Sequence, residues 1–192
     1  MLDEVCKFLN KRRQKGLHCV PIAVNFSRKH IRENCFRQRL CQVVDRYGLP
    51  RNLIELELTE SDMMSDSKEI IQYVAQIRSD GFNVAIDDFG SGYSSLNMLK
   101  DVPFDVIKID REFFSEVITS EASILILRKI MEMAEGLGIR VLCEGVETAE
   151  QVEILKELGC YYVQGYYYSK PISSDEFVEK SCVDKAGGKE YY

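Results

Sequence analysis

The stretch NVAIDDFGSGYSSL, residues 83–96, decides how this sequence is interpreted. An apolar run ends in two adjacent acids, Asp87 and Asp88, and continues as Phe-Gly-Ser-Gly. The run predicts a β-strand, and the glycines after it predict a tight turn. Taken alone, two acids before Phe-Gly are typical of a turn or a helix cap. The rest of the chain decides whether this strand delivers two carboxylates to a functional site.

Composition places the chain among ordinary globular proteins. It has 192 residues, of which 45% are apolar and 29% charged, enough for one domain with a core. The net charge of −6 argues against a basic surface for DNA or RNA. No apolar run approaches the roughly 18 residues that span a bilayer, and the N-terminus lacks a signal-peptide pattern. Seven cysteines without a C-x-x-C motif suggest a reduced, cytoplasmic chain.

Short β-rich runs alternate with segments of helical periodicity. The β-rich runs are 19–27, 53–60, 83–89, 104–110, 140–146 and 160–166, and the helical segments are 3–15, 33–48, 66–81, 120–138 and 148–159. Such alternation predicts βα units around a parallel sheet. One domain is expected over residues 1–182, followed by a disordered tail at 183–192. The tyrosines of 160–169 are expected to pack between strand and helix.

Each β-rich run carries a polar residue directly after an apolar one, toward its end. These residues are Asn25, Glu57, Asp87 with Asp88, Lys108, Glu144 and Gln164. Their spacing is about one βα unit, which predicts that they share one rim. In a TIM-type (β/α) barrel, the active site lies on the rim at the carboxyl ends of the strands. A doubly wound sheet fits the sequence less well, because such a sheet usually carries a Gly-rich turn and no G-x-G-x-x-G follows a strand here. The predicted fold is therefore an α/β, TIM-type barrel that is incomplete, with about six of eight strands.

The acids of this rim predict a metal site. Four carboxylates at close range repel one another unless cations are present, and oxygen-rich sites suit Mg²⁺, Mn²⁺ or Ca²⁺. Two metal ions about 3.5–4 Å apart are a common device for phosphoryl transfer. Lys108 would stabilise charge on a phosphate oxygen or hold a water. Gly90, Ser91 and Gly92 would let the following loop approach a ligand.

An alternative for Lys108 is Schiff-base chemistry of the aldolase kind. It requires a lysine desolvated among apolar neighbours. The surrounding acids argue against this alternative.

The stretches AVNFS, LELTES, IDDFGSGYSSL, IKID, CEGVET and QGYYYSKP resemble the EAL domain, the bacterial cyclic di-GMP phosphodiesterase family. The resemblance covers about residues 3–178, in the family's order and spacing. It implies a TIM-type barrel that hydrolyses cyclic di-GMP to linear pGpG with Mg²⁺ or Mn²⁺. It also implies a homodimer, and an upstream sensor or GGDEF-type domain in a longer protein.

The resemblance assigns roles to individual residues. The implied metal ligands are Asn25, Glu57, Asp87 and Asp88. Lys108 resembles the lysine that contacts the attacking water, Glu144 a further acid at that centre, and Gln164 a residue close to it. Glu147 resembles a glutamate that braces the loop after the acid pair, and that loop supports dimerisation in the family.

The sequence departs from the family pattern in three places. Ser91 replaces a threonine, and Cys143 replaces an alanine. The Glu-Ala-Leu motif that names the family is absent, so the strand that carries a metal-ligand Glu and a substrate-contacting Arg is expected to be missing. This departure leaves an alternative function: a catalytically impaired module that binds cyclic di-GMP or dimerises.

Overall fold

The structure, a computed structural model, describes residues 1–31, 33, 35–63, 67–90, 96–117 and 120–183. Within these residues, the sheet has six parallel strands that are hydrogen-bonded in the order of the sequence, from β1 to β6. The strands are β1 (Ile22–Asn25), β2 (Ile54–Thr59), β3 (Asn83–Phe89), β4 (Val106–Ile109), β5 (Arg140–Cys143) and β6 (Tyr162–Val163). The predicted α/β class and parallel sheet are confirmed.

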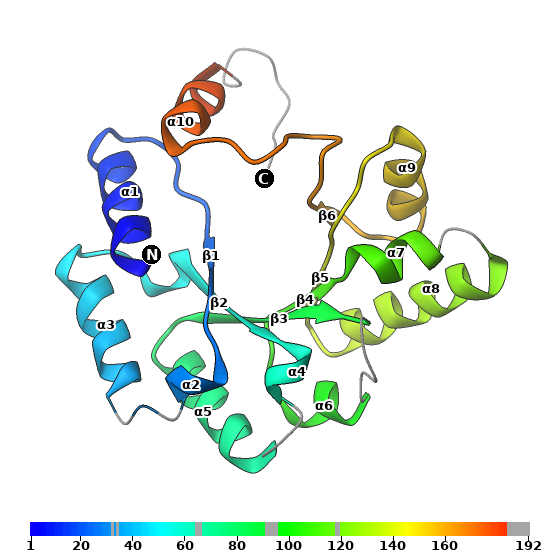
Figure 1. The fold of residues 1–192 in the computed structure, drawn as a ribbon, viewed down its shortest axis with the longest axis horizontal. Helices are drawn as coiled ribbons and strands as arrows, with labels where there is room; N and C mark the ends of the chain where they lie inside the picture. Colours follow the sequence, from blue (N-terminus) through cyan, green and yellow to red (C-terminus); the bar gives the residue numbers. More distant parts are fainter. Residues whose placement is uncertain (32, 34, 64–66, 91–95, 118–119, 184–192) are drawn as a thin grey trace.

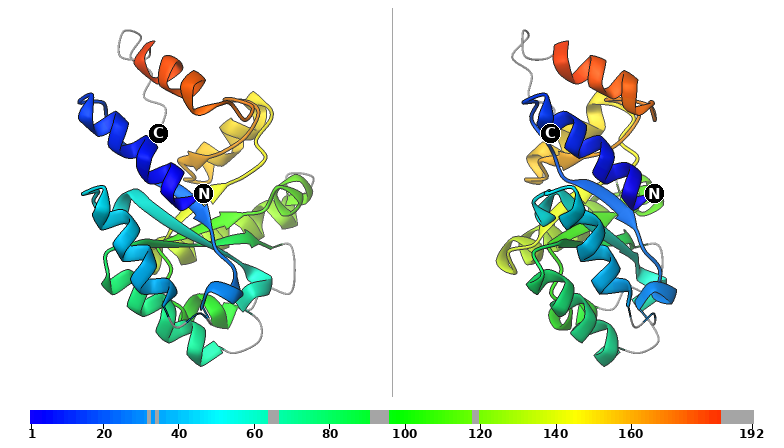
Figure 2. Two further views of the ribbon diagram at one scale, coloured as in Figure 1. Left: turned by 60° about the vertical axis from the view of Figure 1, so that its left-hand side comes forward. Right: turned by 90° about the vertical axis from the view of Figure 1, so that its left-hand side faces the viewer.

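Helices lie around the outside of these strands (Figure 1; two further views in Figure 2). They are α1 (Leu2–Gln14), α2 (Arg28–Ile31), α3 (Phe36–Arg46), the 3₁₀ helix η1 (Arg51–Leu53), α4 (Glu60–Met63), α5 (Ser67–Ser79), α6 (Leu96–Asp101), α7 (Arg111–Val117), α8 (Glu121–Gly136), α9 (Ala149–Glu157) and α10 (Ser174–Val183). None of the helices within the described residues is long and apolar enough to cross a membrane.

The sheet curls into part of a barrel without closing. In the described chain, the hydrogen-bonded order runs from β1 to β6 and no pairing joins these two strands. The strands and their surrounding helices therefore form an incomplete ring (Figure 1). This arrangement confirms the predicted TIM-type architecture with six of eight strands.

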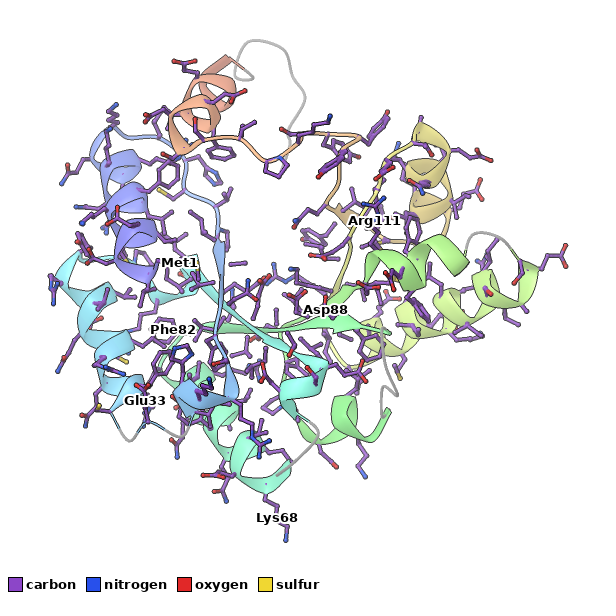
Figure 3. The ribbon with its side chains drawn as sticks, in the orientation of Figure 1. Met1, Glu33, Lys68, Phe82, Asp88 and Arg111 are labelled. Carbon is purple, nitrogen blue, oxygen red and sulfur yellow. The ribbon has the colours of Figure 1, made fainter. Side chains whose placement is uncertain are left out.

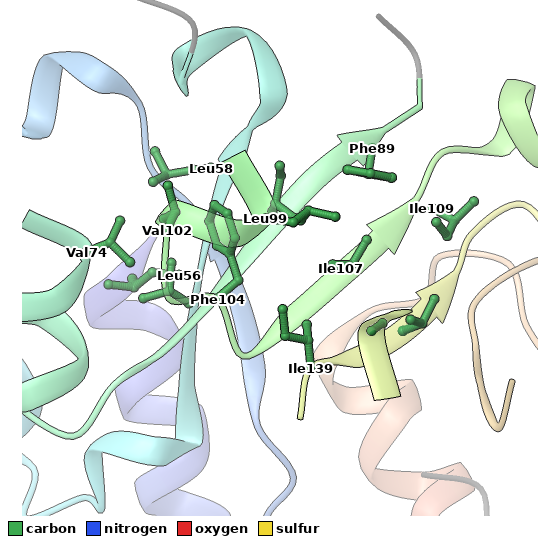
Figure 4. Close-up of a cluster of buried hydrophobic side chains, with 14 of the residues drawn as sticks. Leu56, Leu58, Val74, Phe89, Leu99, Val102, Phe104, Ile107, Ile109 and Ile139 are labelled. Atoms are coloured by element: carbon green, nitrogen blue, oxygen red, sulfur yellow. The ribbon is translucent and has the colours of Figure 1, made fainter. Parts of the chain in front are cut away.

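Alternation along the strands gives the sheet one apolar and one polar face. Ile54, Leu56 and Leu58 of β2 are buried on the outer face, as are Ile86 of β3 and Ile107 of β4. Figure 4 shows Leu56, Leu58 and Ile107 of this outer face in one cluster with Val74 of α5 and Leu99 of α6. Burying each such side chain stabilises the fold by about 1.5–3 kcal/mol. Because side chains alternate, the residues between them face the inside of the barrel.

Five predicted helices are present, with ends that differ from the expected ones by up to three residues. The capping box at the start of α9 is confirmed, since Thr148 accepts a hydrogen bond from Gln151 N while the Gln151 side chain bonds back to Thr148 N. The helices α2, α4, α6, α7 and α10 were not predicted. Val183, which was assigned to the tail, is the last residue of α10, and residues 184–192 lie outside the described part.

The tyrosine-rich segment differs from its prediction. Tyr161 is 80% exposed and Tyr162, in β6, is 43% exposed, while Tyr166, Tyr167 and Tyr168 are also exposed. The expectation that these rings pack between strand and helix is wrong. The reason is that β6 is a two-residue strand at the edge of the sheet, where an aromatic side chain has little to pack against.

Candidate active site

The predicted rim residues gather at the carboxyl ends of the strands. Asn25 is the last residue of β1, and Glu57 lies opposite it in β2. Lys108 lies in β4, and Glu144 and Gln164 are the first residues after β5 and β6. Figure 3 shows Asp88 near the middle of the molecule, whereas Lys68 lies on its periphery. The sequence prediction of one polar rim is therefore confirmed by the positions of these residues in the strands.

The two adjacent acids come together through an irregularity in β3. Ile86 pairs with Ile107 of β4, and the next pair is Phe89 with Ile109. Two residues of β3, Asp87 and Asp88, thus lie opposite the single residue Lys108, which is a β-bulge. Asp88 adopts φ 56°, in the left-handed region that few non-glycine residues occupy. Because of the bulge, strict alternation no longer holds at the two carboxylates.

Lys108 is the centre of a cluster of acids from three other strands or strand ends. Its Nζ lies 2.6 Å from Glu57 Oε1, 3.1 Å from Asp87 Oδ1 and 2.6 Å from Glu144 Oε1. The side chains of Lys108 and Glu57 are only 8% and 5% exposed. Three carboxylates against one ammonium leave a buried excess of negative charge. Such an excess is costly unless a further cation shares it.

Electrostatics at this cluster shifts several pKa values. Burial raises the pKa of Glu57, and the opposing ammonium of Lys108 offsets only part of this shift. The pKa of Asp88 is raised by burial and by the charges of Asp87 and Asp110. Burial alone would favour the neutral amine of Lys108, but the close ion pairs of its Nζ with Glu144 and Glu57 outweigh burial and raise its pKa. Lys108 is therefore protonated, which argues against a nucleophilic role in Schiff-base chemistry.

Asn25 and Gln164 flank the cluster at the two edges of the sheet. Asn25 pairs in register with Glu57, and its side chain is exposed. Gln164 donates its backbone N–H to the carbonyl oxygen of Cys143 at 2.8 Å, and its own carbonyl accepts from Val146 N at 3.1 Å. Both residues thus lie on the predicted rim and outside the set of acids that contact Lys108.

Of the loop that follows the two acids, the structure describes Gly90. Gly90 has φ 98°, and a Cβ there would lie 2.7 Å from the ring of Phe113, so glycine is required by both conformation and space. Glu147 Oε1 lies 2.7 Å from Arg111 Nη2. Ser91 and Gly92 lie outside the described residues, and so does the predicted bracing of their loop by Glu147.

Two features of the site were not predicted from the sequence. Asp110 follows β4 and accepts hydrogen bonds from Glu112 N and Phe113 N, at the start of α7. One layer below the rim, Arg140 Nη2 of β5 lies 3.6 Å from Glu55 Oε2 of β2. The sequence contains a pattern that could have indicated each of them. Asp110 directly follows an apolar strand, and Glu55 is two residues before Glu57, which puts both side chains on the same face of the strand.

The donor chemistry of the cluster fits a divalent cation. Glu57 Oε1 and Asp87 Oδ1 are buried, and within the described residues neither has a well-directed hydrogen bond, although Lys108 Nζ is within ion-pair distance of both. Buried carboxylate oxygens with unused lone pairs are the ligands that Mg²⁺ and Mn²⁺ prefer. No three His, Cys, Asp or Glu residues in the described ranges stand close enough together to hold an ion in this arrangement. Lys108 lies among the acids instead.

The chain matches a known protein family. The model of the EAL domain family matches residues 1–171. The EAL domain of Mycobacterium smegmatis DcpA has a similar crystal structure, with a TM-score of 0.86 and 32% sequence identity, over 95% of this chain and 82% of that one. The predicted resemblance is thereby confirmed.

Two further proteins connect the fold with a nucleotide. The cyclic di-GMP phosphodiesterase NbdA of Pseudomonas aeruginosa is 32% identical over 97% of this chain and 24% of its own length. A manganese and cyclic di-GMP complex of Klebsiella pneumoniae BlrP1 has a TM-score of 0.80 at 28% identity, over 90% of this chain and 44% of that one. The chain spans between 19% and 28% of the length of the curated relatives that it matches.

Proposed function

We propose, from the premise that the chain belongs to the EAL domain family, that it hydrolyses cyclic di-GMP to linear pGpG with bound Mg²⁺ or Mn²⁺. The observation that carries this proposal is the contact of Lys108 Nζ with three carboxylates, those of Glu57, Asp87 and Glu144. A buried, acid-rich rim with one cation suits a phosphodiester substrate approached through divalent metal ions. NbdA and the BlrP1 complex support the choice of nucleotide.

The acids and the asparagine would hold the metal ions. Glu57, Asp87 and Asp88 supply carboxylate oxygens from β2 and β3, and Asn25 adds an amide oxygen from β1. When bound, divalent ions offset phosphate charge and make water a better nucleophile. The bulge in β3 matters here because it places two successive carboxylates opposite the same residue. A regular strand would point one of them into the outer apolar core.

Lys108 and the residues after β5 and β6 would act on the water and the phosphate. The ammonium of Lys108 donates hydrogen bonds and has no lone pair with which to accept a proton, so it would orient the attacking water or stabilise a phosphate oxygen. Glu144, 2.6 Å away, fixes the position of that ammonium and would accept a proton from the water. Gln164 would contact the same centre from β6. Gly90, Ser91 and Gly92 would contact the substrate.

A second candidate function is binding of cyclic di-GMP without cleavage. Two observations on the described residues favour it. Lys108 occupies the space among the acids, and no three His, Cys, Asp or Glu side chains are already arranged to bind a metal ion. In that case the chain would act as a receptor or a dimerisation module. Measured binding and hydrolysis together distinguish the two functions.

We also propose the setting in which the chain acts. It would form a homodimer and work in the cytoplasm, joined to a sensor or GGDEF-type domain. The curated relatives, which are about four times as long as this chain, support a larger multidomain protein.

The test is hydrolysis of cyclic di-GMP by the purified protein with Mg²⁺ or Mn²⁺, with pGpG resolved by chromatography. Asp87→Asn removes one rim carboxylate and should lower turnover by roughly 10²-fold or more. Asp101→Asn, at an exposed acid outside the rim, is the matched control and should leave turnover unchanged.

Equilibrium binding of cyclic di-GMP is measured beside turnover. Tight binding by folded protein without any pGpG would support the receptor function. Turnover that persists unchanged in Asp87→Asn would mean that the rim is not the active site.

A further inference from the structure

Two buried thiols touch one another directly behind the rim. Cys143 is the last residue of β5, and Cys160 lies in the turn between α9 and β6. Their Sγ atoms are 3.7 Å apart, and the two residues are 0% and 3% exposed. The pair lies on the outer face of the sheet, while the adjacent Glu144 contacts Lys108. The two thiols are thus linked to the acid cluster through a single peptide bond.

We propose that Cys143 and Cys160 form an oxidisable dithiol whose conversion to a disulfide changes the geometry of the rim. Thiol contact at 3.7 Å is about 1.7 Å longer than a disulfide bond of about 2.0 Å. Side-chain rotation together with a small shift of β6 would close that difference. The oxidant is a hydroperoxide, of which hydrogen peroxide is the smallest.

The reaction balances in two steps. The thiolate of one cysteine attacks a peroxide oxygen, an S–O bond forms, the O–O bond breaks, and the hydroxide released takes up a proton as water. The second thiolate then attacks the sulfenic sulfur, an S–S bond forms, the S–O bond breaks and a second water leaves. In sum, two thiols lose two electrons and two protons, and one hydrogen peroxide becomes two waters.

The place of the pair in the fold makes it reachable. In the described chain, β6 is a two-residue strand at the edge of the sheet, paired only with β5. Short edge strands open locally at a small part of the global unfolding free energy. Such an opening would admit a molecule as small as hydrogen peroxide to Cys160, which lies between α9 and that strand.

A shift at the dithiol would reach two rim residues. The carbonyl oxygen of Cys143 accepts the backbone hydrogen bond of Gln164 at 2.8 Å, and Glu144 follows Cys143 in the chain. Movement of β6 toward β5 therefore displaces Gln164 and changes the approach of Glu144 to Lys108. A displacement of about 1 Å at a catalytic group can cost roughly 10²-fold in rate. This consequence for turnover rests on the proposed phosphodiesterase function, whereas formation of the disulfide does not.

The experiment begins with peptide mapping. The reduced protein is treated with hydrogen peroxide, its free thiols are blocked with iodoacetamide, and it is digested with trypsin without reductant. Cleavage at Arg140, Lys156 and Lys180 puts the two cysteines on separate peptides, 141–156 and 157–180. We expect a linked pair of these peptides in the mass spectrum, which disappears after dithiothreitol. Its absence, while exposed Cys35 is oxidised in the same sample, would overturn the proposal.

Variants separate the dithiol from other effects of peroxide. Cys143→Ala cannot form the bond and should show no linked peptide, while Cys35→Ala should show the same linked peptide as the unchanged protein. Turnover of cyclic di-GMP should fall roughly 10- to 100-fold as the linked peptide accumulates, and recover with dithiothreitol. Cys143→Ala should keep its turnover in peroxide.

The outcomes distinguish this inference from the proposed function. A linked peptide in a protein that hydrolyses no cyclic di-GMP, reduced or oxidised, supports the dithiol and contradicts the phosphodiesterase. Full turnover from a fully cross-linked protein would overturn the coupling to the rim.

Discussion

Asp87 Oδ1 lies 3.1 Å from Lys108 Nζ, and the bulge in β3 places both Asp87 and Asp88 opposite that one lysine. One extra residue in β3 therefore explains how adjacent acids reach the same small space. The energetic consequence is a cluster in which Glu57, Asp87 and Glu144 share a single buried ammonium. Each acid depends on Lys108 for compensation of its charge, and the lysine depends on them to remain protonated.

Replacing Lys108 by methionine should destabilise the fold and abolish hydrolysis. At about pH 7.5 the change leaves buried carboxylates without a cation, and breaking such a cluster costs about 3–5 kcal/mol. Urea denaturation of Lys108→Met beside the unchanged protein gives the difference in the free energy of unfolding. Lys129→Met, at an exposed lysine of α8, is the matched control and should change stability by less than about 1 kcal/mol. Equal effects of the two changes would contradict the cluster.

The loss of unfolding free energy in Lys108→Met should become smaller as the pH falls. The contribution of Lys108 is present below the unfolded pKa of lysine, about 10.4, and is lost only as pH rises through its raised folded pKa. Glu57 has a raised pKa, so its neutral form favours folding below about pH 4.3 and its charged form opposes folding above. In Lys108→Met the acids protonate at higher pH. The difference in the free energy of unfolding between this variant and the unchanged protein should therefore shrink as the pH is lowered from about 7.5 to about 5. A difference that does not change with pH would contradict this account.

Divalent cations should stabilise the protein against heat. Binding at a hundredfold excess over Kd adds about 2.7 kcal/mol, which corresponds to a rise in Tm of roughly 5–10 °C for a chain of this size. Differential scanning fluorimetry with MnCl₂ or MgCl₂, reversed by EDTA, measures the shift. Asp88→Asn should reduce the shift while keeping a residue that tolerates positive φ. An equal shift in Asp88→Asn would place the cation elsewhere.

Asp88→Gly should raise stability while lowering activity. The left-handed backbone at Asp88 costs a non-glycine residue roughly 1–2 kcal/mol, and its half-buried carboxylate has a raised pKa. Glycine removes both penalties together with a proposed metal ligand. We expect a higher midpoint in urea and turnover reduced by roughly 10²-fold. A loss of stability in this variant would show that the carboxylate of Asp88 supports the fold.

The sequence predicted the parts of the fold that depend on local periodicity. The strand 83–89 has the predicted bounds, and the polar rim follows from residues that each stand after an apolar one. The bulge could not be predicted, because it depends on the count of residues between two pairings on β3 and β4. The contact of Glu57 with Lys108 likewise depends on the curvature that brings β2 near β4 across β3.

The errors have physical reasons of the same kind. Short helices such as α2 and α4, of four residues each, carry too few residues for a periodicity to be recognised. The exposed Tyr161 and Tyr162 show that apolar composition predicts burial only where another element covers the segment. The contact of buried Cys143 with Cys160 could not be predicted either, because it joins residues 17 positions apart that only the pairing of β5 with β6 brings together.

Gly165→Ala should displace the neighbouring rim residue Gln164. A Cβ at this position would clash with the backbone carbonyl oxygen of Val146, which accepts a hydrogen bond from Tyr167 N at 3.0 Å. The obstacle is backbone that is itself hydrogen-bonded to Gln164, so it cannot simply rotate away. Overpacking of this kind costs about 1–3 kcal/mol. The accompanying displacement of Gln164 should lower turnover of cyclic di-GMP more than it raises KM.

Gly136→Ala is the matched control for this change. Gly136 ends α8, and a Cβ there would meet nothing within 4 Å. The substitution should be neutral or stabilise the protein by about 0.4–1 kcal/mol, because alanine restricts the unfolded chain. Urea denaturation and steady-state kinetics on both variants check the pair. Should Gly165→Ala behave like Gly136→Ala in both measurements, the close approach of Gly165 to the backbone of Val146 would not be required for the geometry of the rim.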